Sequence, residues 1–239
     1  MTRFEFKYIL NPVQEQALRS AVSKFLSLDM SAKKRGGWYP VTSLYFDTPQ
    51  LADYYDKSGG YLIRKKLRAR IYTPFLTPET PEIWLEIKKK HDMSFHKTRC
   101  LITMDDWNNL LQHRYTAVLT KERPLADATV LHEFMWYLLQ EGRRPTFFIR
   151  YIRCPYRDAH SELRITFDSR IEAQAHPDLT KPSFLKPVHK HTVMEVKYSK
   201  ETLPAWFGSL VRLYDVRRDS FSKYGVSVEQ LHAFNRLPR

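Results

Sequence analysis

Glycine is scarce in this chain, which has only 7 glycines in 239 residues. Neither GxGxxG nor GxxxxGKS/T occurs, so the sequence lacks the phosphate-binding loops of Rossmann and P-loop proteins. Any phosphate binding must therefore come from side chains. The 2 cysteines, Cys100 and Cys154, have no motif spacing, which argues against a zinc site and a disulfide framework.

Long apolar runs are also missing. The longest, such as residues 134–139, are far too short to cross a bilayer, and residues 1–8 alternate charged and aromatic side chains, unlike a secretory signal. Together with the cysteine usage, these features predict a cytoplasmic protein. Peripheral attachment to the inner face of a membrane is an alternative that the sequence leaves open.

The balance of charge is strongly basic, with 39 Lys and Arg against 26 Asp and Glu and a net charge of +13. Such an excess predicts a polyanionic partner. The charge alone does not choose between nucleic acid, an acidic membrane surface and a phosphate compound. A hydrophobic fraction of 43% and an aromatic fraction of 14% indicate a folded globular protein.

The segment 61–72 carries the most informative pattern. Read as a strand, it has one basic face and one largely aliphatic face, with Lys65 as the exception. The basic face is formed by Arg64, Lys66, Arg68 and Arg70. The aliphatic face is formed by Ile63, Leu67, Ala69 and Ile71. Four cations on one face repel one another in water, so this face makes better sense if it converges on a ligand with several negative charges.

Similar alternation recurs along the chain, separated by helical patterns. The expected strands are residues 3–8, 39–46, 61–72, 83–90, 95–102, 146–154, 162–169 and 192–198. A first helix is expected to begin at Asn11-Pro12, and residues 49–60 are expected to form a short helical turn. Further helices are expected over residues 105–113, 129–141, 204–214 and 228–237. The segment 221–225 would present Lys223 before the last of these helices. No repeat or linker divides the sequence, so residues 1–239 are expected to form a single domain.

These strands favour an α+β fold with an antiparallel β-barrel, closed or nearly closed. In a barrel, interior and exterior residues alternate along each strand. The aliphatic faces would then point outward under the helices, and the cations would line a polar lumen. Crowded cations repel in a low-dielectric space, and a polyphosphate chain would neutralise them. For any single strand, an ordinary solvated polar face explains the pattern as well.

An ordered set of short motifs carries a resemblance to a known family. The motifs are Arg3-x-Glu5-x-Lys7-Tyr8, Ser43-Leu-Tyr-Phe-Asp47, Lys66-Leu-Arg-Ala-Arg70, Glu86-Ile-Lys88, Lys97-Thr-Arg99, Arg164-Ile165, Met194-Glu-Val-Lys197 and Ser222-Lys-Tyr224. The chain resembles the VTC domain, the catalytic domain of the vacuolar transporter chaperone type of polyphosphate polymerase. That domain belongs to the triphosphate tunnel, or CYTH-like, superfamily, and the resemblance covers essentially the whole chain.

The resemblance implies an enzyme that binds ATP in a tunnel and transfers its terminal phosphoryl group to inorganic polyphosphate. By match to the family pattern, the phosphate ligands in catalysis would be Lys7, Arg68, Arg70, Lys88, Lys97, Arg153, Arg164 and Lys223. Further substrate-binding residues would be Lys66, Arg99, Lys197, Tyr45 and Arg3. Glu195, with Glu5, would hold Mn²⁺ or Mg²⁺, although ion pairs with neighbouring lysines are the alternative for both carboxylates.

Two departures from the superfamily pattern bear on the reaction. Superfamily hydrolases begin with Glu-x-Glu-x-Lys, and here the first glutamate is replaced by Arg3, which favours transfer to phosphate over hydrolysis. Some eukaryotic relatives have a second lysine three residues before the one matched by Lys223, and this chain has Ser220 at that position. The alternatives are a triphosphatase of the same fold and a non-catalytic module that binds polyphosphate or nucleic acid. Double-stranded nucleic acid is not expected, and a separate membrane protein that exports the product is a further possible partner.

Overall fold

The computed structural model describes residues 4–91, 94–175, 178–199 and 203–235. Its strands form one antiparallel sheet in the order β1-β10-β8-β7-β3-β4-β5-β6, to which β2 and β9 are added at β7 and β8. The strands are β1 (Phe4–Leu10), β2 (Ser27–Leu28), β3 (Tyr39–Asp47), β4 (Ile63–Ile71), β5 (Ile83–His91), β6 (Ser94–Ile102), β7 (Arg144–Arg157), β8 (Arg164–Ala175), β9 (Lys186–His189) and β10 (Thr192–Tyr198).

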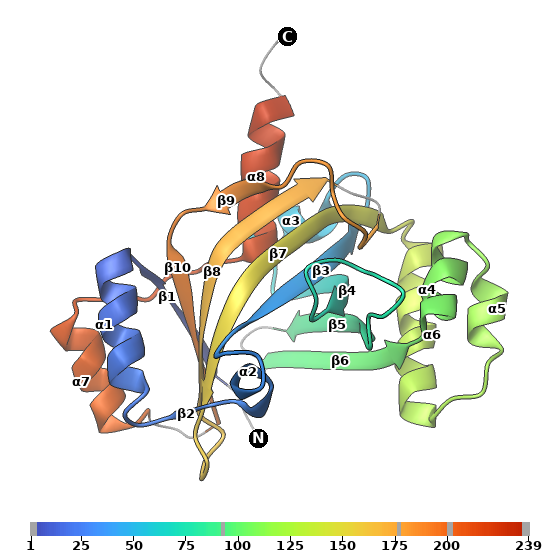
Figure 1. Cartoon of the computed structure of the whole chain (residues 1–239). Coiled ribbons are helices and arrows are strands. Elements are labelled where there is room, and N and C mark those ends of the chain that lie inside the picture. Colours follow the sequence, from blue (N-terminus) through green and yellow to red (C-terminus); the bar gives the residue numbers. More distant parts are fainter. Residues whose placement is uncertain (1–3, 92–93, 176–177, 200–202, 236–239) are drawn as a thin grey trace.

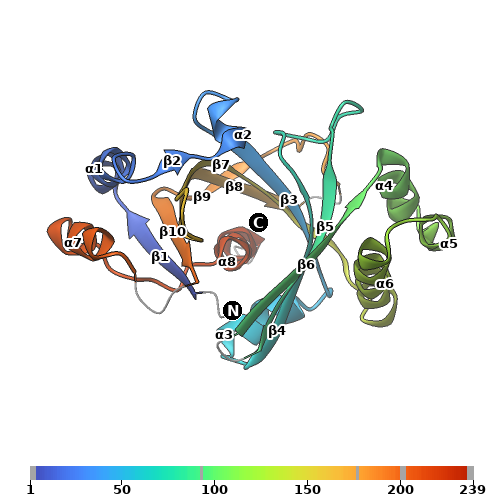
Figure 2. The ribbon, with the colours of Figure 1, turned by 90° about the horizontal axis from the view of Figure 1, so that it is seen from below.

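Helices cover the convex side of this strongly curved sheet at two places (Figures 1 and 2). The helices are α1 (Pro12–Val22), α2 (Met30–Lys33), α3 (Ala52–Ser58), α4 (Met104–Leu111), α5 (Tyr115–Leu119), α6 (Leu125–Gln140), α7 (Ala205–Leu213) and α8 (Lys223–Asn235). Helices α1 and α7 pack over β1, β10 and β8, whereas α4, α5 and α6 pack over β4, β5 and β6. The start of α1 follows from its sequence, because Asn11 and Gln14 form a capping box around Pro12.

The alternation predicted for residues 61–72 is confirmed in β4. Leu67, Ala69 and Ile71 are fully buried in the outer core beneath α6. Arg68 and Arg70 therefore point to the opposite, concave side of the sheet. The same rule places alternate charged residues of β1, β5, β6, β7, β8 and β10 on that concave side.

The sheet does not close into a barrel, so the closed form of the predicted barrel, which was expected to be closed or nearly closed, is wrong. Within the described residues, β1 and β6 are the two edges and share no backbone hydrogen bond. Side chains alone bridge the opening, where Lys88 on β5 lies 3.3 Å from Glu5 on β1. Each edge strand already packs against its own helices, and the like charges on the facing walls oppose a closer approach.

Helix α8 lies inside the curve of the sheet (Figure 2). It packs on an apolar cluster that includes Tyr45, Phe147, Tyr224 and Val228. Apolar side chains of α8 therefore fill the end of the concave space at which this helix lies, and α2 lies toward the other end of the sheet (Figure 1). The prediction of a polar, cationic lumen holds for the remainder of the concave side and is wrong for the end that α8 fills.

Several local predictions also need correction. Lys223 is the first residue of α8 and does not precede it, and α4 begins at Met104 after its cap Thr103, one residue earlier than predicted. Four short elements, β2, β9, α2 and α5, were not predicted. Among the described residues, no helix is both long and apolar enough to span a lipid bilayer.

Candidate functional site

A first group of charges surrounds Glu86 of β5. Arg68 directs two of its nitrogens at one Glu86 oxygen, each at 2.7 Å, and Arg70 Nη1 lies 3.8 Å from the same oxygen. Lys97 on β6 makes an ion pair with the other oxygen. Burial alone would raise the pKa of Glu86, but these three cations hold it well below its usual range. Glu86 is thus a permanent anion that orients cations from two strands.

Neutral side chains fix the two arginines further. Arg68 Nη1 donates to the Tyr45 hydroxyl at 3.0 Å. Arg70 Nε donates to Ser43 Oγ at 3.1 Å, and its Nη2 donates to the Tyr151 hydroxyl at 3.4 Å. A guanidinium held in this way loses little freedom when it binds phosphate oxygens with its fork.

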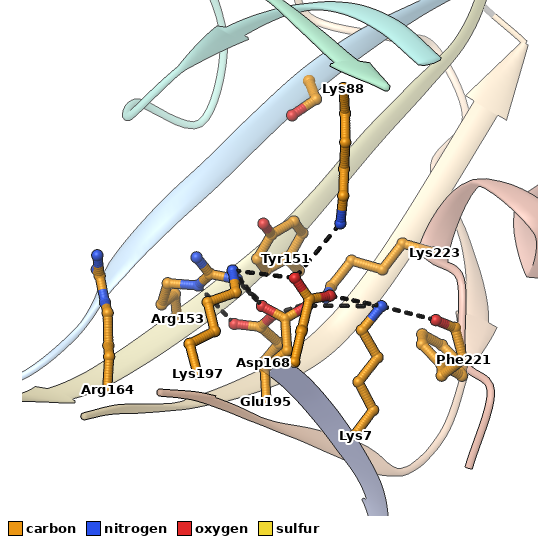
Figure 3. A network of polar contacts seen from close by, with 12 residues as sticks. Lys7, Lys88, Tyr151, Arg153, Arg164, Asp168, Glu195, Lys197, Phe221 and Lys223 are labelled. Carbon is orange, nitrogen blue, oxygen red and sulfur yellow. Dashed lines mark hydrogen bonds and ion pairs between the residues drawn. The ribbon is translucent and has the colours of Figure 1, made fainter. Parts of the chain in front are cut away.

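A second group, shown in Figure 3, lies on β1, β10, β8 and β7. On β1 and β10 the register sets Lys7 opposite Glu195 and Glu5 opposite Lys197, which alternates the signs of charge. Lys7 Nζ lies 3.2 Å from Glu5 and 3.7 Å from Glu195, while Lys197 Nζ lies 3.1 Å from Glu195 and 3.7 Å from Glu5. Burial opposes ionisation of Glu5, yet the cations Lys197, Lys7 and Lys88 lower its pKa to about 2.

Asp168 ties this group to α8. It accepts two hydrogen bonds from Arg153, each at 2.7 Å, and lies 2.6 Å from Lys223 Nζ. Arg153 also reaches Glu195 at 3.5 Å. Burial alone would lower the pKa of Lys223, but Asp168 and Glu195 raise it, so this lysine stays charged.

Lys66 lies between the two groups and the start of α8. Its Nζ donates to Ser222 Oγ at 2.9 Å and stands 5.2 Å above the Tyr224 ring. Burial, together with the nearby cations Lys57 and Lys7, lowers the pKa of Lys66 to about 7. Burial and Arg68 lower the pKa of Lys97 to about 7 as well. An anion placed here would relieve that cost.

Arg164 and Arg99 lie apart from these groups, at the end near α2. Arg164 Nη2 contacts Asp29 at 3.1 Å, its Nε is buried without a hydrogen-bond partner, and Figure 3 places it away from the Asp168 network. The guanidinium of Arg99 lies 4.2 Å from the centre of the Trp84 ring. Both arginines line a cavity of about 500 Å³ with Tyr39, Tyr72 and Trp84. We call this cavity the mouth pocket.

The structure therefore brings most of the predicted site residues onto one concave surface. Lys7, Lys66, Arg68, Arg70, Lys88, Lys97, Arg153, Lys197 and Lys223 lie in the two charged groups or between them, with Tyr45, Glu5 and Glu195. Arg3 falls outside the described residues. The predicted site did not include Ser43, Tyr151, Asp168 or Ser222, which contact its cations. Of these, Asp168 shares a strand face with Arg164, and that spacing was the available signal.

The carboxylates present suit a divalent cation only in part. Within the described residues, no cluster of three or more His, Cys, Asp or Glu side chains is arranged as a metal site. Glu5 and Glu195 share Lys7 and Lys197 as neighbours, so their oxygens face a common region. Mg²⁺ commonly uses one or two carboxylates and completes its shell with water and substrate phosphates. The pair therefore fits a metal that arrives with a phosphate ligand.

Comparison with known proteins gives one family and a set of similar folds. A family model described as the VTC domain matches residues 2–232. No curated protein matches the chain. A putative adenylyl cyclase from Hippeastrum, described as having a dominant triphosphatase activity, aligns with a TM-score of 0.56 at 16% identity over 96% of each chain. A putative adenylate cyclase from Bacillus halodurans aligns with a TM-score of 0.54 at 12% identity, over 93% of this chain and 96% of that one. At such identities the likeness shows a shared fold alone.

Proposed function

Because this chain belongs to the VTC domain family, we propose that it is an ATP-dependent polyphosphate polymerase that transfers the γ-phosphoryl group of ATP to the end of a polyphosphate chain. The observation that supports this proposal best is the convergence of cations from both walls of the curved sheet on one surface. Their number and burial suit a ligand with a row of negative charges. The transfer itself needs alignment and charge neutralisation more than covalent help from the protein.

Carboxylates of the protein already hold the cations of the concave surface. Arg68, Arg70 and Lys97 contact Glu86, while Arg153 and Lys223 contact Asp168. These contacts keep the cations oriented before the substrate arrives, which lowers the entropy cost of binding. Phosphate oxygens would then join the same donors, with arginine forks binding oxygens in pairs and lysines acting as point charges.

The concave carboxylates are weak bases. The pKa of Glu5 is lowered to about 2, and those of Glu86, Asp168 and Glu195 are also lowered by the cations that overcome burial. A general base works best with a pKa near the working pH. An anionic terminal phosphate needs no such base, so this environment favours a phosphate acceptor over water. A divalent cation held by Glu195 and Glu5 would supply further neutralisation of charge on the phosphate oxygens.

A triphosphatase activity is the second candidate. The Hippeastrum protein of similar fold is described with that activity, and Lys66 has a pKa of about 7, which suits a base that accepts a proton from water. If Lys66 serves in this way, it must act in its neutral form. The polymerase proposal instead uses the charged form of Lys66 as a phosphate ligand.

The products distinguish the two reactions. Purified protein should be incubated with ATP, Mn²⁺ and a short polyphosphate primer, and the products should be separated by gel electrophoresis and assayed for ADP and orthophosphate. The expected result is ADP with longer chains. Arg68→Ala should abolish both, whereas Lys24→Ala, an exposed lysine beyond the end of α1, should leave both unchanged. If the protein releases orthophosphate and makes no longer chains, the polymerase proposal is refuted and the triphosphatase is supported.

A further inference from the structure

We propose that the mouth pocket is the nucleoside subsite of the phosphoryl donor, where the base of ATP stacks beside Trp84; this inference rests on the proposed use of ATP. The pocket measures about 500 Å³, within the size range of sites for small organic ligands. It lies beside α2, which contributes Ser31 to its lining. Helices α2 and α8 lie toward opposite ends of the curved sheet (Figure 1).

The chemistry of the concave surface changes at this pocket. Between the pocket and α8, cations paired with carboxylates dominate. The pocket has cations and carboxylates too, namely Arg35, Arg99, Arg164, Asp29 and Glu82, but three aromatic side chains, Tyr39, Tyr72 and Trp84, lie among them. A bare phosphate chain has no flat ring to stack on these aromatic side chains. A nucleoside has a flat ring that stacks on aromatic side chains, and hydroxyl and amino groups that donate to carboxylates.

Trp84 is held in place by two neighbours. Its Nε1 donates to Glu82 at 2.9 Å, and the Arg99 guanidinium lies 4.2 Å from the ring centre. Tyr39 and Tyr72 form a second aromatic unit, with ring centres 5.8 Å apart and an edge-to-face angle of 81°. Stacking between a base and an aromatic ring is strengthened when the ring is fixed beforehand, because less side-chain entropy is lost.

The pocket also adjoins the phosphate-binding cations directly. Trp84 is the register partner of Arg70 across β4 and β5, and Arg99 follows Lys97 on the same face of β6. At the boundary, Arg164 Nε is a buried donor without a hydrogen-bond partner. A nucleotide with its base beside Trp84 would therefore place its phosphates against Arg70 and Lys97. Its terminal phosphate would point toward the start of α8, where Lys66 and Lys223 lie.

Inorganic triphosphate provides a ligand with the same phosphates and no nucleoside. Binding of ATP and of inorganic triphosphate should be measured by calorimetry without divalent metal, so that turnover does not interfere. Trp84→Ala is expected to weaken ATP binding about tenfold, in the range measured for base stacking, and to change triphosphate binding less than about twofold. Trp84→Phe should retain most of the ATP affinity, because it keeps a flat ring. Trp136→Ala, at an exposed tryptophan on the convex side, should change neither affinity.

Equal weakening of both ligands by Trp84→Ala would overturn the inference, since Trp84 would then act only through the cations. Unchanged ATP affinity in this variant would overturn it as well. The polymerase proposal can fail independently of this inference. If the protein releases orthophosphate without lengthening chains, but Trp84→Ala still weakens only ATP binding, then the nucleoside subsite is supported and the polymerase activity is refuted. Trp84→Phe with the ATP affinity of Trp84→Ala would also count against stacking.

Discussion

Binding of inorganic triphosphate near pH 8 should be accompanied by uptake of almost one proton at Lys66. In the free protein, burial and the neighbouring Lys57 and Lys7 lower the pKa of Lys66 to about 7. At a pH one unit above this value, about 10% of the lysine is charged. Phosphate oxygens next to Nζ reverse the sign of the local field, so the pKa of the bound form rises well above the pH and the remaining ~0.9 proton is taken up.

The affinity follows from the same equilibrium. Between about pH 7 and pH 10, each unit of pH should weaken triphosphate binding up to about tenfold through Lys66 alone, because the ligand must supply the free energy of protonation. Lys97 has a similar pKa of about 7, but its side chain is 40% exposed, so water screens it and its uptake should be smaller.

Calorimetry in buffers of different ionisation enthalpy measures this uptake. The change in apparent binding enthalpy with buffer enthalpy gives the number of protons, and comparison of wild type with Lys66→Met cancels protons that the ligand itself releases. Lys66→Met should remove most of one proton near pH 8, and Lys24→Met should remove none. If the wild type and Lys66→Met take up the same number of protons at pH 8, then Lys66 is already charged in the free protein and the reasoning fails.

Three further predictions concern metal, core and ion pairing. Glu195→Gln should abolish the stimulation of turnover by Mn²⁺, measured in a turnover assay. Its affinity for triphosphate without metal, measured by calorimetry, should stay within about threefold of the wild-type value. If Mn²⁺ still stimulates the variant, Glu195 is not a metal ligand. Leu67→Ala should lower the free energy of unfolding by about 2–5 kcal/mol in urea without changing triphosphate affinity, since Leu67 faces the outer core; a changed affinity would contradict the two-faced strand. Arg143→Ala should lower the free energy of unfolding by about 3–5 kcal/mol, because buried Asp53 loses its two hydrogen bonds from Arg143 at 2.6 and 2.7 Å. A loss below ~1 kcal/mol would contradict a stabilising role for this ion pair.

Alternation within a strand was readable from the sequence because it is local. The period of two in residues 61–72 needs only the backbone geometry of a strand, and it correctly separated Leu67 from Arg68. The same rule placed Glu86 and Lys88 together on β5. The predicted metal ligands, the ATP specificity and the single-domain organisation remain predictions.

Partners across the sheet were not readable, because they depend on register between distant segments. Asp168 binds both Arg153 and Lys223, which lie 15 and 55 positions away in the sequence. Its central role appears only once β7, β8 and α8 are assembled. The position of Lys223 was missed for a related reason: Ser222 Oγ accepts from Gly225 N at the start of α8, and that cap is clear only in the folded chain.

The opening between β1 and β6 has a consequence for how a polymer would be handled. A sealed ring obliges a long chain to pass through end first, and such a chain stays captive between successive additions. Here the described edges of the sheet are linked by the Lys88–Glu5 contact in place of a backbone ladder. If the chain is the polymerase proposed above, such an opening would let a growing product leave sideways, which would favour distributive synthesis with a broad spread of sizes over a few very long molecules.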